Sequence, residues 1–161
     1  ALYLVKKKNI KFFCVLIGKN IKNNILRKKI NQLGLQKNLK LISKCKTIYT
    51  YLGELDIHLL SSKTEGFPNV VAEAMACGTP CVVTDVGDSA FIVGKTGWVV
   101  PSENSVKLAN AIEKALSEIG KSSWKRKCNQ AELRIKKNFS INKMITSYNK
   151  VWSKVNNLKF M

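Results

Sequence analysis

Two carboxylates flank the predicted start of a short helix in the stretch TEGFPNVVAEAMACGTPCVVTDVG, which runs from Thr64 to Gly87. Glu65 lies just before this helix, and Glu73 lies inside it, one turn beyond Asn69. The free N–H groups and the dipole of a helix N-terminus attract anions. A carboxylate one turn into the helix can accept both hydroxyls of a ribose, and one just outside can accept sugar hydroxyls. The spacing therefore predicts a nucleotide-sugar site.

Local signals define the helix and the strand that must position these groups. Gly66 permits a tight turn, and Pro68 suits the first helical position because its missing N–H would be unpaired there. Gly78 is a natural stop after about two and a half turns. The apolar β-branched run Cys81 to Thr84 predicts a strand that is buried on both faces. The unit is thus helix, turn and parallel strand.

This stretch resembles the signature of family 4 retaining glycosyltransferases, and the chain resembles the C-terminal, donor-binding domain of their GT-B fold. The matching residues are Glu65, Gly66, Phe67, Pro68, Asn69, Glu73, Ala74, Ala76, Gly78, Pro80 and Asp85. A weaker resemblance extends from about Lys11 to Trp152. The chain departs from the family pattern at Asp88, where a second glycine is usual, and at Phe91, where a glutamate is usual.

The resemblance implies a role for each site residue. Glu65 would be the catalytic-site acid that meets the transferred sugar, and Glu73 would bind the ribose. The remaining donor-binding residues would be Gly66, Phe67, Pro68, Asn69, Val70, Gly18, Lys19, Lys44 and Cys45, the last two cradling the base through backbone groups. The donor would be a UDP- or GDP-sugar, with no cofactor and no metal; the absence of a DxD motif agrees with a helix dipole in place of a metal ion.

The alternative for the two acids is structural. Glu65 would then be a carboxylate favoured by the helix dipole, and Glu73 a solvated helix residue. In the family, the chemistry takes place against a second domain that holds the acceptor. The resemblance therefore implies that the intact protein is a hexosyltransferase-like enzyme of bacterial polysaccharide or glycolipid synthesis, which transfers a sugar with retention. It also implies that this chain is inactive without the second domain.

Strands alternate with helices along the chain, which predicts an α/β fold: a Rossmann-like parallel sheet with helices on both faces and a C-terminal helical tail. The predicted strands are residues 11–18, 39–43, 57–61, 81–84 and 97–100, and the main helices are 21–33, 47–52, 68–77, 105–119, 122–139 and 140–157. Ligands of such sheets bind at the carboxyl ends of the strands. We expect one donor-binding domain over 1–161 that lacks its first strand, a C-terminal helix within 140–161, and no N-terminal acceptor domain.

The chain is strongly basic, with 28 Lys and Arg against 10 Asp and Glu, a formal net charge of +18. Such a charge attracts polyanions, including anionic lipid head groups and nucleic acid. The lysines are scattered, which favours solvated faces first, a membrane-surface role second and nucleic-acid binding a distant third. A rival hypothesis is a non-catalytic nucleotide- or polyanion-binding module, either a degenerate domain or a partner subunit.

No apolar run of about 18 residues and no signal peptide are present, so we expect a cytoplasmic protein, or one peripheral to the inner face of the membrane. The five cysteines include no CxxC pair and predict buried, reduced thiols rather than a zinc site or disulfides. His58 lies in the run DIHLLSS, which predicts a strand residue with a hydrogen-bonded ring rather than a general base.

Overall fold

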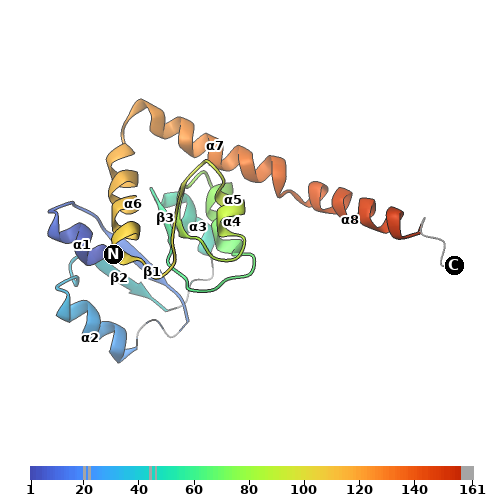
Figure 1. Cartoon of the computed structure of the whole chain (residues 1–161). Coiled ribbons are helices and arrows are strands. Elements are labelled where there is room, and N and C mark those ends of the chain that lie inside the picture. Colours follow the sequence, from blue (N-terminus) through green and yellow to red (C-terminus); the bar gives the residue numbers. More distant parts are fainter. Residues whose placement is uncertain (20, 22, 44, 46, 157–161) are drawn as a thin grey trace.

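The computed structural model describes residues 1–19, 21, 23–43, 45 and 47–156. Strands and helices alternate through most of this part of the chain and are followed by three longer helices (Figure 1). The elements are α1 (Leu2–Lys7), β1 (Cys14–Ile17), α2 (Asn24–Gln32), β2 (Leu39–Ile42), α3 (Ile48–Glu54), β3 (His58–Leu60), α4 (Asn69–Ala76), β4 (Cys81–Thr84), α5 (Ser89–Val93), β5 (Trp98–Val100), α6 (Ser105–Glu118), α7 (Ser122–Asn138) and α8 (Ile141–Asn156).

All paired strands are parallel, as predicted. β1 pairs with β2, and β4 lies between β3 and β5, with His58 opposite Cys81 and Val82 opposite Trp98. The sequence predicts one continuous sheet, but within the described residues no ladder joins β1 to β3. The fold class is therefore confirmed, with the parallel strands divided into a pair and a triplet.

The central strand β4 is buried on both faces because helices cover it from two sides. Its side chains alternate: Cys81 and Val83 join a core with α4, α5 and α7, whereas Val82 joins a core with α1 and α6. This period of two is the geometry of an extended strand. The first core contains Met75 and Ile92, both fully buried. Helices on both faces, as predicted, thus fix β4 and the loops at its ends.

Predicted element boundaries agree with the structure to within a few residues. The helix expected from residue 21 begins at Asn24, because the Asn23 side chain accepts a hydrogen bond from the Leu26 N–H at 2.8 Å and caps the helix there. The predicted burial of the cysteine thiols holds for Cys81 on β4, and burial raises the pKa of this thiol. Cys77, in contrast, is exposed.

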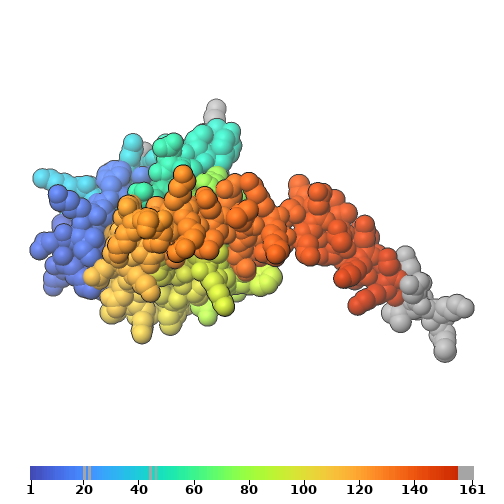
Figure 2. All heavy atoms as spheres, turned by 90° about the horizontal axis from the view of Figure 1, so that it is seen from above, coloured from blue at the N-terminus to red at the C-terminus, as the bar shows by residue number. Residues whose placement is uncertain are grey.

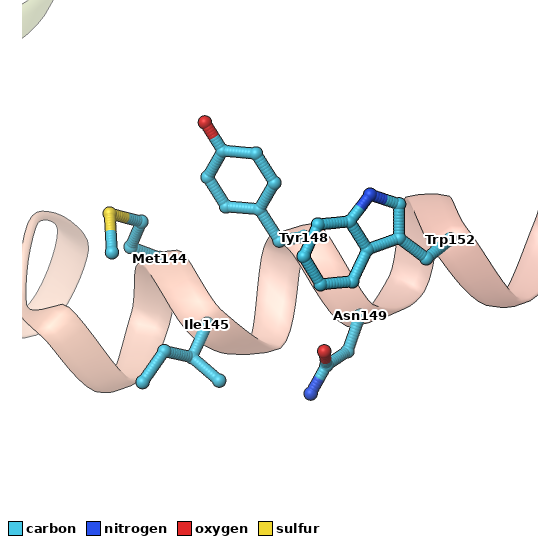
Figure 3. A pocket seen from close by; sticks show the side chains of 5 residues that line it. All are labelled: Met144, Ile145, Tyr148, Asn149 and Trp152. Carbon is cyan, nitrogen blue, oxygen red and sulfur yellow. The ribbon is translucent and has the colours of Figure 1, made fainter.

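The helix α8 extends away from the rest of the molecule (Figure 2). Its apolar side chains are exposed, and Tyr148 packs against Trp152 with 5.7 Å between ring centroids, beside Met144 (Figure 3). The helix lies within the predicted range 140–161, of which residues 157–161 fall outside the described part of the chain. None of the described helices is long and apolar enough to cross a bilayer.

His58 is the first residue of β3, as predicted, but its Nε2 atom is buried with no hydrogen-bond partner among the described residues, so the expectation of a hydrogen-bonded ring was wrong. Burial lowers the pKa of His58 from 6.5 to about 4, because a buried ring loses the hydration of its charged form. The folded state therefore favours the neutral ring. Its contribution to stability is complete above pH 6.5 and is lost as the pH falls from 6.5 toward 4.

We expect the free energy of unfolding to fall by about 2 kcal/mol between pH 7 and pH 5 because of this group alone. Urea titrations of the wild-type chain and of His58→Leu, at both pH values, measure the effect. The variant should lose less stability on acidification by that amount. Equal losses in the two proteins would show that His58 does not titrate as a buried ring.

Candidate functional site

The N-terminus of α4 offers unpaired donors. Pro68 precedes the helix as its N-cap, and no side chain caps the first turn. The Val71 N–H donates to the Pro68 carbonyl at 3.0 Å, but the N–H groups of Asn69 and Val70 have no partner within the described residues. Free donors at a helix start attract an anion. The geometry expected of an anion-binding helix end is therefore present.

Glu73 lies on the exposed stripe of α4. Val71, Ala74 and Met75 are fully buried, whereas Asn69 and Glu73, four residues apart, are exposed. Side chains with this spacing lie one above the other on a helix surface. The Glu73 carboxylate has no hydrogen bond or ion pair in the described structure, so both of its oxygens are available to a ligand.

Glu65 is held in the loop between β3 and α4. The Ser62 hydroxyl donates to Glu65 Oε1 at 2.6 Å, and the Thr84 hydroxyl, at the end of β4, donates to the Ser62 carbonyl at 2.7 Å. The carboxylate is exposed, with its second oxygen unpaired in the described structure. A chain of two hydrogen bonds thus ties the acid before the helix to the most buried strand.

The loop after β4 closes against the same segment. The Asp88 N–H donates to the Gly66 carbonyl at 2.9 Å. Gly87 has a φ of +50°, and a Cβ atom there would lie 2.2 Å from the Gly66 oxygen. Only glycine allows this approach, because any side chain would collide with the backbone. The glycine at position 87 thus lets the loop after β4 approach Gly66 closely enough for the Asp88 N–H to bind the Gly66 carbonyl.

The other described residues of the predicted set follow the strands of the β1–β2 pair. Gly18 follows β1 and donates its N–H to the Ile42 carbonyl at 3.1 Å, Lys19 is exposed, and Cys45 is half-buried. Lys44 lies outside the described residues. These positions follow the carboxyl ends of β1 and β2, while Glu65 and its neighbours follow β3. Their convergence on one ligand stays a prediction.

Comparison with known proteins identifies the family. The sequence pattern described as "Glycosyl transferases group 1" matches residues 1–118. The chain belongs to this family. Over 139 residues, or 83% of its length, this glycosyltransferase chain is 26% identical to the Vi polysaccharide biosynthesis protein VipC/TviE of Salmonella typhi. It is also 32% identical over 107 residues, 62% of its length, to the UDP-N-acetylglucosamine–peptide N-acetylglucosaminyltransferase GtfA subunit of Streptococcus gordonii.

Solved structures share the fold of this glycosyltransferase chain. A glycosyltransferase from Rickettsia africae ESF-5 superposes with a TM-score of 0.86 at 23% identity, covering 98% of this chain and 43% of that one. Anabaena Alr3699/HepE in complex with UDP gives 0.78 at 20% identity, covering 98% and 45%. The chain spans only 24% of the Salmonella protein and 21% of the Streptococcus protein. These neighbours confirm the expected GT-B glycosyltransferase fold for this chain, which matches less than half of each of the two structures.

Sequence reasoning missed the residues that hold the site. Ser62, three residues before Glu65, and Thr84, the last residue of β4, are common polar residues in positions that carry no motif. Phe139, far along the chain, places its ring 5.9 Å from that of Phe67. No local sequence pattern predicts this ring contact, because it depends on how α7 packs against α4.

Proposed function

We propose that this chain binds the nucleotide-sugar donor of a glycosyltransferase that transfers the sugar with retention. The observation that supports the proposal is the start of α4. The N–H groups of Asn69 and Val70 have no partner in the described part of the chain, Glu65 is fixed before the helix, and Glu73 is exposed one turn inside it. The family membership supports transfer chemistry. Relatives solved with UDP or UDP-glucose support a uridine nucleotide as the first donor to test.

Each group has one role in this proposal. Glu73 accepts hydrogen bonds from both ribose hydroxyls, which a carboxylate with two free oxygens can do. The Phe67 N–H donates to the sugar, and the N–H groups of Asn69 and Val70 donate to diphosphate oxygens. The helix dipole stabilises the charge that develops on the leaving diphosphate. Glu65, with one oxygen engaged by Ser62, directs the other toward hydroxyls of the transferred sugar.

Calorimetry with UDP, GDP and ADP tests the proposal. We expect saturable binding of one nucleoside diphosphate in preference to the others, with modest salt dependence. The net charge of +18 favours a second candidate, a polyanion-binding module. That candidate predicts no nucleotide binding, together with binding to DNA or anionic vesicles that weakens steeply with salt. The two sets of results exclude each other.

We further propose that the acceptor binds outside this chain, which spans less than half of the structures it matches. Chemistry then needs both parts, so the purified chain should bind nucleotide without turnover. Measurable sugar transfer by the chain alone would contradict this.

A further inference from the structure

A cluster of three phenylalanine rings joins the candidate site to the end of α7. Phe139 follows α7 directly and donates its backbone N–H to the Ile135 carbonyl at 2.9 Å. Its ring centroid lies 5.9 Å from that of Phe67, with 56° between the planes, and 5.5 Å from that of Phe91, at 79°. These are favourable tilted and edge-to-face geometries. Phe139 is the member of the cluster that contacts both other rings.

Arg134 fixes the end of α7 that carries Phe139. Its Nε donates to the Ile92 carbonyl at 2.7 Å, its Nη2 donates to the Phe91 carbonyl, and its guanidinium lies 5.9 Å from the Phe139 ring centroid. Gly94 leaves room for this arrangement, because a Cβ there would lie 2.6 Å from Arg134 Cζ. The last turn of α7 is therefore bound to the end of α5, and Phe139 projects from a fixed support.

Phe67 belongs to the segment that would meet the donor sugar. It follows Glu65 and Gly66, and its side chain is 43% exposed, so its own loop does not enclose it. The Gly66 carbonyl is held by Asp88, and Pro68 is buried. The Phe139 ring supplies the support that Phe67 lacks within its loop. Glu73, in contrast, is carried by a helix whose inner face is packed into the core.

We propose that Phe139 is a positioning residue for the candidate donor site. Through its ring contact it holds the segment from Glu65 to Phe67 in the arrangement that receives the sugar, without contacting the donor itself. The inference takes its ligand, a nucleotide-sugar, from the proposed function. The claim that Phe139 holds this segment depends only on the ring contacts. The expected consequence is selective: recognition of the sugar depends on Phe139, and recognition of the nucleotide does not.

The test compares UDP with UDP-glucose and UDP-N-acetylglucosamine by calorimetry, and records the amide resonances of residues 65–67 without ligand. Phe139→Ala should reduce the affinity gained from the sugar by about fivefold to tenfold and leave UDP binding unchanged. It should also shift the amide resonances of that segment. Phe139→Tyr, which keeps the ring, should restore both. Phe91→Ala is the matched control, since it removes the ring of the cluster that has no contact with Phe67 in the described structure.

Three results would overturn the proposal: unchanged amide resonances in Phe139→Ala, equal losses for UDP and the UDP-sugars, or an effect of Phe91→Ala as large as that of Phe139→Ala. The resonances need no ligand, so they judge the positioning role even if the wild-type chain binds no nucleotide. Failure of the wild-type chain to bind would instead contradict the proposed function. The two failures are therefore distinguishable.

Discussion

Replacing Glu73 by glutamine is expected to weaken UDP binding by about 30-fold. A carboxylate that accepts two hydroxyl hydrogen bonds gains from its charge, and losing that gain costs about 2 kcal/mol. Simple electrostatics predicts the opposite sign, because the substitution removes a negative charge near a bound anion. Calorimetric titration of the wild-type chain and the variant with UDP decides between the two.

Glu54→Gln provides the control for the charge change. Glu54 is exposed at the end of α3 and lies outside the proposed site. Its replacement by glutamine changes the net charge by the same amount as Glu73→Gln. It should leave UDP affinity unchanged or raise it slightly. A Glu73→Gln variant that binds UDP as tightly as the Glu54→Gln variant would remove the ribose-binding role, and with it the main support for a nucleotide site at α4.

Replacing Glu65 by glutamine is expected to reduce sugar transfer by about 100-fold, equivalent to about 2.7 kcal/mol of transition-state stabilisation. The reason is that Glu65 meets the transferred sugar in the proposed geometry, where charge develops during the reaction. The measurement requires a polypeptide that carries this chain together with an acceptor domain. UDP affinity should stay unchanged, because Glu73 and the helix N-terminus hold the nucleotide.

A graded variant separates position from charge. Ser62→Ala keeps the Glu65 carboxylate but removes the hydroxyl that orients it, so a smaller loss of about tenfold is expected. The order should be wild type, then Ser62→Ala, then Glu65→Gln. Transfer within about twofold of wild type in Glu65→Gln would assign this acid to the structural alternative, a carboxylate placed by the helix dipole.

The helix, turn and strand around the site were predictable because their signals are local. Local signals place the start of the helix at Pro68, its end at Gly78 and the strand at Cys81 to Thr84. Each lies within a few residues of its position in the structure. The separation of the strands into a β1–β2 pair and a β3–β4–β5 triplet was not predictable. Strand pairing joins residues that are distant in the chain, and the sequence of one strand does not identify its partner.

The sequence by itself determined that two acids stand on either side of a helix start, one before Pro68 and one a turn beyond Asn69. Spacing along a helix is set by backbone geometry, so it can be read from residue order. Only the tertiary structure decided what holds Glu65 and its segment: the hydrogen bonds from Thr84 through Ser62 to Glu65, and the Phe139 ring against Phe67. These contacts depend on how separate elements pack, and packing is a property of the folded chain rather than of any single stretch of it.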